Sequence, residues 1–465
     1  MSEISEIQNK IKFISYAEEE LKNYLSNQEI KLTEKQETAL EYLIQGKNVF
    51  LTGPAGTGKS LVISLYKKFF SKCKVIGLTS TTGISATLIK GTTLHSYLGI
   101  GLGTADTNSL VNKIRRLKHM RKRWEDLEVL IIDEISMLSP DLFDKIEEIA
   151  RMLRCNNHVR LLRKNENQTT TPSFGGVQLI LSGDFLQLPP VKSLGFCFEA
   201  KYWNKCIEEV VYFTENLRQN DHDFQDVLND IRLGKISKKV KKILTECSEK
   251  ELKNEMGIKP TLIYSTNYDV DVKNESELDE LCKKNNDLDF YEYEMEIFLE
   301  EKSKNSQDII DKFKKSCLAP ENIHLCIGAQ VMLIFNLEVE SGLANGTRGV
   351  VVNFIENLPI VKFLNGEERI IEYHTWALEE DDKKILRLVQ IPLKLAWAIT
   401  THKSQGMTLD YAEVDLSNVF DYGQAYVALS RVKSKEGLKI KNLNFDCIKA
   451  HPKALDYYNK LEQNN

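Results

Sequence analysis

One eight-residue segment, Gly53-Pro-Ala-Gly-Thr-Gly-Lys59-Ser60, constrains the fold of this chain more than any other feature. It fits the pattern G-x-x-x-x-G-K-[ST], follows an apolar run at 49–52 and leads into a helix-like segment that begins at Leu61. This strand–loop–helix context lets consecutive backbone N–H groups converge on phosphate oxygens at the partly positive start of a helix. The sequence therefore predicts a nucleotide site formed by Gly53, Pro54, Ala55, Gly56, Thr57, Gly58, Lys59 and Ser60.

A second motif supplies the partners that this loop needs for hydrolysis. Residues 130–137 contain a short apolar run followed by two adjacent carboxylates, Asp133 and Glu134. Lys59 would reach the β- and γ-phosphates, while Ser60 and Asp133 would ligate Mg²⁺. Glu134 would position the attacking water. An ordinary core strand that ends in two acids is the alternative, but its place downstream of Lys59 favours a nucleotide hydrolase.

Composition excludes several other classes of protein. The chain has 465 residues, 42% hydrophobic and 28% charged, which predicts two to four globular domains. No apolar run approaches the length of a membrane span, and the acidic-polar first residues argue against a targeting leader. The nine cysteines show no C-x-x-C pair, so we expect free thiols in a reducing compartment, cytoplasmic or nuclear. A viral or organellar origin stays open.

The net charge of −5 does not by itself indicate nucleic-acid binding, but charge is unevenly placed along the chain. Positions 113–123 hold seven Lys or Arg residues and no acid, whereas positions 275–301 are strongly acidic. A local basic face, rather than the sum of charges, decides nucleic-acid binding. We expect the acidic stretch to be a solvated helix face.

The order of apolar runs predicts an α/β fold. Short β-branched runs alternate with helical segments, which favours a mostly parallel sheet covered by helices. A second set of α/β strands is expected further on, and the dipeptides Asn345-Gly346 and Asn365-Gly366 predict hairpin turns of a small antiparallel insertion. The expected strands lie at 48–52, 74–79, 129–132, 177–181 and 210–213 in the first set, and at 260–265, 330–335, 412–416 and 437–441 in the second.

Several polar residues are candidates for contacts with the nucleotide beyond the loop. Gln187 follows a buried run in Gly183-Asp-x-x-Gln187 and could sense the γ-phosphate. Arg218 and Arg431 are candidates for stabilising transition-state charge, although each could instead form a surface salt bridge. Gln36 lies 17 residues before Gly53, where an amide can read adenine.

Two further segments suit contacts with single-stranded nucleic acid. Thr82, His95 and Tyr97 follow the second strand, where hydroxyls and an aromatic ring could line a channel. His402 and the residues beside it form a polar turn, whose groups suit phosphate contacts. A buried turn with satisfied polar groups is the alternative for that turn.

Taken in order, these segments resemble the Pif-type (petite integration frequency) superfamily 1 helicases, the relatives of RecD that move 5′ to 3′ on DNA. The resemblance extends over positions 32–442, and its most specific parts are 179–191, 393–408 and 424–432. It implies two RecA-like P-loop domains of α/β class with ATP between them and a small SH3-like β insertion in the second. Loop 155–173 is longer than the family pattern, and we expect no further C-terminal domain.

The resemblance also implies roles and boundaries. Gln36 would contact adenine; Gln187, Arg218 and Arg431 would surround the γ-phosphate; and Thr82, His95, Tyr97, Pro189, His402, Lys403 and Ser404 would lie near single-stranded DNA. The expected boundaries are 1–30 for an N-terminal helical appendage, 31–215 for the first RecA-like domain with a small wedge insertion near 97–125, 216–335 with 388–450 for the second, 336–387 for the β insertion and 451–465 for a C-terminal tail.

The function implied is that of an ATP-dependent DNA helicase, which uses ATP and Mg²⁺ to translocate 5′ to 3′ on single-stranded DNA and unwind duplexes. Its partners would be single-stranded DNA and forked or tailed duplex DNA, with no membrane, and the protein would be a monomer in solution. A translocase that displaces nucleoprotein without processive unwinding has the same motifs and stays an alternative. A binding protein with an inert ATPase fold is a second alternative, against which the complete set of motifs speaks.

Overall fold

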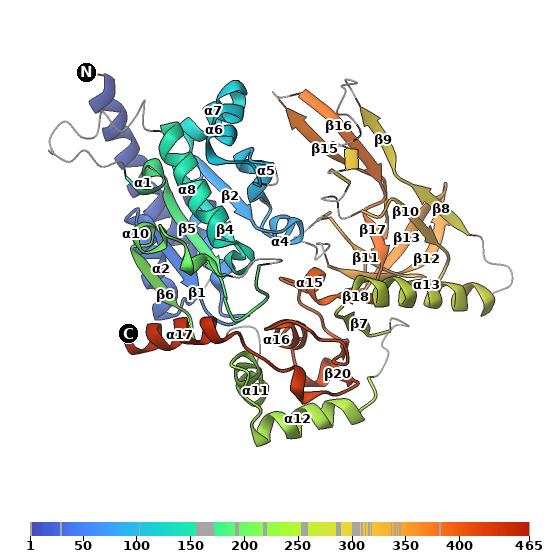
Figure 1. Cartoon of the computed structure of the whole chain (residues 1–465). Helices are drawn as coiled ribbons and strands as arrows, with labels where there is room; N and C mark the ends of the chain where they lie inside the picture. The colour runs from blue at the N-terminus through green and yellow to red at the C-terminus, as the bar shows by residue number, and fades with distance from the viewer. Residues whose placement is uncertain are drawn as a thin grey trace. The chain divides into compact units, whose positions relative to one another are not determined.

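The computed structural model describes residues 2–27, 30–101, 103–154, 172–190, 195–216, 221–252, 259–284, 290–299, 307, 310–311, 313–314, 317, 319–335, 337–338, 341, 343, 346–380 and 383–464. The chain divides into two compact units, Met1–Arg218 and Gln219–Asn465, each considered by itself (Figure 1).

The first unit is organised around a parallel sheet of six strands in the order β3-β2-β4-β5-β1-β6. The central strands are buried along their whole length, as expected of a parallel sheet with both faces covered. The strands are β1 (Val49–Thr52), β2 (Ile76–Ser80), β3 (Thr92–Thr93), β4 (Val129–Asp133), β5 (Gln178–Gly183) and β6 (Glu209–Tyr212).

Alternate strand residues bury against helices on opposite faces of this sheet. Val49 and Leu51 belong to a core shared with α2 (Glu34–Ile44) and α3 (Lys59–Phe70). Phe50 faces the other way, where its ring lies 5.4 Å from that of Trp203. The other helices of this unit are α1 (Ser2–Asn27), α4 (Gly83–Leu88), α5 (Leu94–Leu98), α6 (Thr107–Arg116), α7 (Lys118–Asp126), α8 (Pro140–Arg154) and α10 (Trp203–Cys206).

Helix α1 contributes to the same core. Its Ala17 and Leu21 are buried with the apolar faces of α2 and α3, and the ring of Tyr24 lies 5.4 Å from that of Phe69. The C-terminal half of α1 is therefore packed against the first unit.

The second unit contains a smaller parallel sheet and an antiparallel region. The parallel sheet has the order β18-β7-β19-β20. Its strands are β7 (Thr261–Tyr264), β18 (Ala398–Thr400), β19 (Ala412–Asp415) and β20 (Leu438–Lys441). The helices of this unit are α11 (His222–Arg232), α12 (Lys238–Glu249), α13 (Asn267–Lys284), α15 (Thr401–Ser404), α16 (Gln424–Leu429) and α17 (Pro452–Asn464).

Among the residues that the structure describes, the antiparallel region forms three small sheets, with orders β14-β13-β12-β11-β17, β15-β16-β9 and β10-β8 (Figure 1). The predicted turn at Asn365-Gly366 is confirmed, because Gly366 has φ +87° and joins β13 to β14. Asn345, of the other predicted turn, lies outside the described residues. The strands are β8 (Tyr291–Glu294), β9 (Glu296–Leu299), β10 (Asn322–Leu325), β11 (Gln330–Leu333), β12 (Arg348–Ile355), β13 (Leu358–Phe363), β14 (Glu368–Ile370), β15 (His374–Glu380), β16 (Lys383–Gln390) and β17 (Leu393–Leu395).

One strand prediction was wrong. We expected residues 330–335 in the second parallel set, but β11 pairs antiparallel with both β12 and β17. Strand β18 instead lies beside β7 in the parallel sheet. All four residues of β11 are buried, and a short, fully apolar run does not reveal which sheet a strand joins.

Candidate nucleotide and DNA site

The predicted phosphate loop joins the end of β1 to the start of α3. Gly58, immediately before the helix, has φ +83° and ψ 17°, the left-handed conformation that glycine adopts without steric cost. A Cβ at Gly53 would lie 2.3 Å from the carbonyl oxygen of Phe213, so only glycine fits between this strand and the end of β6. The backbone therefore has the tight turn that a phosphate cradle needs.

Lys59 lies at the first position of α3 and reaches back over the loop. Its Nζ donates hydrogen bonds to the carbonyl oxygens of Gly53 and Pro54, at 2.7 and 2.8 Å. The ammonium is thus held at the mouth of the loop, where the positive end of the helix adds to its charge.

Asp133 ends β4 beside this loop and is 7% exposed. Burial raises the pKa of its carboxyl. The Ser182 hydroxyl, the backbone of Glu134 and the charge of Lys59 oppose that rise. Because Lys59 acts on Asp133 electrostatically, the fold brings the two predicted motifs to one end of the sheet.

Ser60 and Asp133 fit a magnesium ion. A hydroxyl and a carboxylate present oxygen atoms, which this hard cation prefers. A dication would also offset the cost of burying the Asp133 charge. Within the described residues, no group of three or more His, Cys, Asp or Glu side chains could hold a metal ion.

Glu134 has an unusual backbone conformation. Its φ of 54° and ψ of 46° place a residue other than glycine in the left-handed region, which costs free energy and is frequent at functional sites. The Thr81 hydroxyl donates to the carbonyl of Glu134 at 2.8 Å. A Cβ at Gly183 would lie 2.9 Å from the backbone nitrogen of Ile135. The ends of β2 and β5 therefore hold the Glu134 turn in place.

The polar turn after β5 carries the next predicted residues. Gln187 is 6% exposed, and its backbone N–H donates to the carbonyl of Asp184 at 3.0 Å. Asp184 is fully buried and accepts from the N–H of Leu186 at 3.1 Å. Pro189 is half-buried further along. The structure thus gives Gly183-Asp-x-x-Gln187 a compact turn next to the carboxylates.

Gln36 links α2 to the phosphate loop. Its Oε1 accepts from the backbone N–H of Thr33 at 3.1 Å, and its Nε2 donates to the carbonyl of Thr57 at 3.2 Å. The side chain is fully buried. A contact between this amide and adenine stays a prediction. Such a contact would replace one of these two hydrogen bonds.

Asn216 is a loop contact that sequence reasoning missed. Its Nδ2 donates to the carbonyl of Ala55 at 3.2 Å, so the segment after β6 touches the phosphate loop. An asparagine three residues after an expected strand gives no signal of such a contact by itself. Arg218, two residues further on, lies outside the described residues.

The residues predicted along a single-strand channel in the first unit differ in their surroundings. Thr82 accepts from the N–H of Ser85 at 3.2 Å at the start of α4. Half-buried His95 has a pKa lowered by burial. The ring of Tyr97 packs against Gly77 and lies 5.2 Å from the Arg123 guanidinium. Tyr97 thus has a packing role within the unit, which weakens the case for stacking on a base.

In the second unit, the predicted polar turn forms the short helix α15. Lys403 is exposed, and half-buried His402 has a pKa lowered by burial and raised in part by Asp421. Ser404 is fully buried and donates to the carbonyl of Thr401 at 2.7 Å. Its burial argues against direct contact with DNA, so His402 and Lys403 are the candidates that remain here.

Lys394 on β17 is a second residue that sequence reasoning missed. Burial, together with the nearby charge of Lys403, lowers the pKa of Lys394 to about 8. The positive charges of the two lysines repel each other, and a bound phosphate would offset this repulsion. An isolated lysine in an apolar run gives no sequence signal of this proximity.

Arg431 follows α16 and is 2% exposed. Its Nε donates to the carbonyl of Val427 at 2.7 Å, and one terminal nitrogen donates to the hydroxyl of Ser430 at 2.8 Å. These contacts fix the guanidinium within the second unit. A contact with the γ-phosphate stays a prediction.

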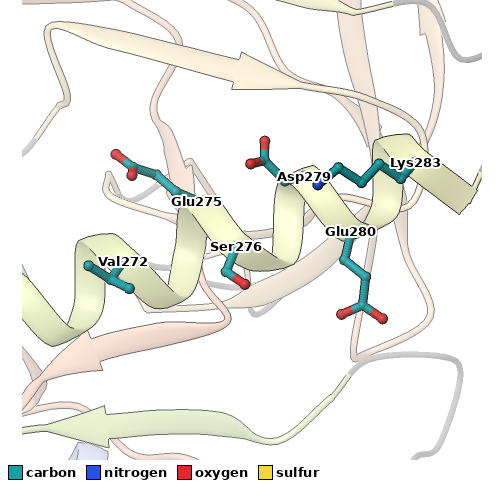
Figure 2. A pocket seen from close by; sticks show the side chains of 6 residues that line it. All are labelled: Val272, Glu275, Ser276, Asp279, Glu280 and Lys283. Carbon is teal, nitrogen blue, oxygen red and sulfur yellow. The ribbon is translucent and has the colours of Figure 1, made fainter.

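A surface hollow of about 450 Å³ lies along one face of α13, and no residue of these motifs lines it (Figure 2). Acids dominate this face, in accordance with the solvated helix face expected within 275–301. We therefore assign it no role in catalysis. The lining residues are Val272, Glu275, Ser276, Asp279, Glu280 and Lys283.

A phosphate loop, a buried aspartate and a strained glutamate at the ends of parallel strands define a P-loop nucleotide hydrolase. Two protein-family models match the chain. The model of the PIF1-like helicases matches residues 31–242, and the model of the Pif1 DNA helicase 2B domain matches residues 308–354. The chain belongs to the PIF1-like family of ATP-dependent DNA helicases, and the predicted family and α/β class are confirmed.

Individual relatives agree with this assignment. The chain is 39% identical to uncharacterized protein 030L of Invertebrate iridescent virus 6, over 94% of this chain and 95% of that one. It is 38% identical to the ATP-dependent DNA helicase PIF1 of Xenopus laevis and 37% identical to that of Homo sapiens. It covers only 65% and 64% of those two helicases, which match 94% and 93% of this chain.

Solved structures show the same fold. The crystal structure of Pif1 helicase from Candida albicans has a TM-score of 0.79 and 34% identity, over 93% of this chain and all of that one. The structure of Bacteroides sp. Pif1 with ADP-AlF4 has a TM-score of 0.73 and 27% identity, over 94% and 98% of the two chains. Within the described part of the chain, no helix has the length and apolar character needed to cross a membrane.

Proposed function

We propose that this chain binds single-stranded DNA and moves along it 5′ to 3′, unwinding duplex DNA with energy from ATP hydrolysis. The observation that carries the proposal is the placement of Lys59, Asp133 and Glu134 at one end of the first parallel sheet. The named relatives support it, because they are ATP-dependent DNA helicases.

In the proposed site the loop backbone and Lys59 hold the phosphates of ATP. Ser60 and Asp133 would hold Mg²⁺, which would neutralise charge on the phosphate oxygens when bound. Glu134 orients the attacking water from a turn whose backbone is left-handed directly after β4. Gln36 supports the loop from behind through the Thr57 carbonyl.

We further propose that Gln187, Arg218 and Arg431 respond to the γ-phosphate. An arginine contributed by the second RecA-like domain would couple hydrolysis to a change in the grip on DNA. Coupling requires that the grip differ between nucleotide states, since a ligand shifts an equilibrium only by its differential affinity. For Arg431 this means giving up bonds within its own unit, such as that to Val427.

On the DNA side, Thr82, His95, Pro189, His402 and Lys403 are the proposed contacts. Support comes from an ssDNA-bound structure of a relative: the Bacteroides Pif1 bound to ssDNA has a TM-score of 0.66 and 28% identity. We propose a monomer in a reducing compartment, in accordance with the eight free cysteines among the described residues.

The test is unwinding of matched duplexes that carry either a 5′ or a 3′ single-stranded tail. We expect ATP-dependent unwinding of the 5′-tailed duplex and ATPase activity that rises sharply with single-stranded DNA. Lys59→Ala should abolish both while leaving single-strand binding within a few-fold. Lys68→Ala is the matched control, because Lys68 lies on the same helix and is exposed.

Two results would overturn parts of the proposal. Unwinding by Lys59→Ala would contradict the assignment of the ATP site, and a preference for the 3′ tail would contradict the polarity. Displacement of a protein block from single-stranded DNA without unwinding would favour the translocase alternative.

A further inference from the structure

Outside the nucleotide and DNA motifs, two thiols of the second unit face each other. The Sγ atoms of Cys282 and Cys326 are 3.8 Å apart, although 44 positions separate the residues in sequence. Cys282 is half-buried in the last turn of α13, and Cys326 is fully buried directly after β10. Nothing in the proposed helicase mechanism uses either thiol.

Both thiols are held by ordered backbone. The turn after β10 is closed by a hydrogen bond from the N–H of Ala329 to the carbonyl of Cys326, at 3.0 Å. It is tied to β12 by the N–H of Gly328, which donates to the carbonyl of Val351 at 2.8 Å. The Leu281 side chain packs closely against Gly328, 3.2 Å from where a Cβ would lie. The end of α13 therefore rests directly on this turn.

The middle of α13 is anchored to a different sheet. Asn274 accepts from the N–H of Ala398 at 2.9 Å and donates to the carbonyl of Ala398 at 3.1 Å. Ala398 opens β18, which leads without interruption into α15 with His402 and Lys403. Helix α13 thus connects the strand that carries the DNA motif to the antiparallel region, and the thiol pair lies at the second of these two junctions.

We propose that Cys282 and Cys326 are a modification site, at which an oxidant of the peroxide class forms a reversible disulfide that fastens α13 to the antiparallel region. In a reducing compartment the pair remains a dithiol, and disulfides that form there are transient and sensitive to redox conditions. The two Sγ atoms, now 3.8 Å apart, must approach to about 2.05 Å for the bond to form.

The chemistry balances with hydrogen peroxide as the oxidant. The thiolate of Cys282, the less buried of the two cysteines, attacks one peroxide oxygen, giving a sulfenic acid and hydroxide that takes up a proton to become water. The Cys326 thiolate then attacks the Cys282 sulfur and expels hydroxide, which leaves as a second water. Two thiols lose two electrons and two protons in total, and one peroxide is reduced to two waters.

The second step is expected to be slow at neutral pH. Burial and the adjacent Cys282 raise the pKa of Cys326 to about 12, so its thiolate is scarce. Formation of the disulfide should therefore accelerate as pH rises, roughly tenfold per unit while the thiolate remains the minor form.

The test treats the full chain with hydrogen peroxide, blocks remaining thiols and maps peptides by mass spectrometry without reduction. We expect a cross-linked peptide pair containing positions 282 and 326, which dithiothreitol separates. The unfolding midpoint of the oxidised protein should rise by several degrees, because the cross-link restricts the unfolded chain.

Cys282→Ser should abolish both the cross-link and the rise in midpoint. This variant is preferred to one at Cys326 because Cys282 is only half-buried and its exchange leaves the core intact. Cys317→Ser, a half-buried cysteine nearby in sequence, is the matched control and should retain both effects. Sulfinic acid at Cys282 without a cross-link, or an unchanged rise in midpoint in Cys282→Ser, would overturn the proposal.

Discussion

The side-chain Nε2 of Gln36 donates a hydrogen bond to the carbonyl oxygen of Thr57, 3.2 Å away, and so joins the start of α2 to the phosphate loop. The same amide closes the N-terminal cap of α2 through Thr33. One side chain thus stabilises a helix end and a catalytic loop together, and its replacement should affect both stability and nucleotide binding.

Gln36→Ala should lower the free energy of unfolding of the first unit by about 1–3 kcal/mol, through the lost cap and the unsatisfied Thr57 carbonyl. The KM for ATP should rise about five- to tenfold. Gln36→Glu retains an acceptor for Thr33 but places a buried carboxylate opposite the Thr57 carbonyl, so it should lower stability and raise KM at least as much as Gln36→Ala. Thermal unfolding and ATP titrations measure the two effects, with exposed Gln45→Ala as control. An unchanged KM in both Gln36 variants would refute the supporting role.

Asn216→Asp should weaken ATP binding more than Asn216→Ala does. The alanine only removes the bond to the Ala55 carbonyl, whereas the aspartate places a negative charge opposite that oxygen and near the phosphates. We expect ATP affinity to fall about threefold in Asn216→Ala and about thirtyfold in Asn216→Asp, which corresponds to about 0.7 and 2 kcal/mol. Equilibrium binding of a fluorescent nucleotide distinguishes them, and equal effects would contradict a direct contact with the loop.

Gly183→Ala should impair catalysis rather than binding. The added Cβ would meet the Ile135 backbone at 2.9 Å and displace the Glu134 turn. A displacement of about 1 Å at a catalytic group can cost about a hundredfold in rate. We expect kcat for DNA-stimulated ATP hydrolysis to fall by about that factor while nucleotide affinity stays within threefold. Glu134→Gln should give the same pattern without the steric clash, and a loss of affinity in Gly183→Ala alone would show that the phosphate loop moved instead.

The pKa of Lys394, lowered to about 8, makes stability depend on pH. Between about pH 8 and 10.5 the unfolded chain holds the proton that the folded chain has released. Stability contributed by this group therefore rises with pH across that window and is smallest below pH 8. Lys394→Met should stabilise the second unit by about 1–2 kcal/mol at pH 7 and flatten the rise.

Urea unfolding at pH 7, 8, 9 and 10 measures this dependence. Lys362→Met, which removes a solvent-accessible lysine from strand β13 of the same sheet, is the control and should leave the pH profile unchanged. A Lys394→Met profile parallel to that of the unmodified protein would contradict the lowered pKa.

The polar turn at α15 gives a test of the DNA contacts. Lys403→Ala should weaken binding of single-stranded DNA and reduce the slope of log affinity against log salt by about 0.7, because one phosphate contact is lost. Ser404→Ala should leave that slope unchanged and instead lower stability by about 1 kcal/mol, since the buried Ser404 hydroxyl donates to the carbonyl of Thr401 within the turn. Fluorescence anisotropy at several salt concentrations separates the two, and a changed slope in Ser404→Ala would restore this residue as a DNA contact.

The predictions from sequence were accurate where a motif is local. The phosphate loop needs only glycines, a lysine and the right flanks, all within a dozen residues, so its strand and helix could be read directly. The carboxylates at the end of β4 were recognised for the same reason. Predictions failed where pairing between distant segments decides, as for β11, whose apolar residues fit a parallel sheet as well as the antiparallel one they join.

The sequence by itself determined the kind of chemistry, because backbone conformation and side-chain type at Gly53–Ser60, Asp133 and Glu134 are properties of short segments. Only the tertiary structure decided which residues support that chemistry. The contact of Asn216 with Ala55, the burial of Lys394 and the meeting of Cys282 with Cys326 each join segments far apart in the chain. Burial and proximity arise from packing of the whole unit, and no local pattern encodes them.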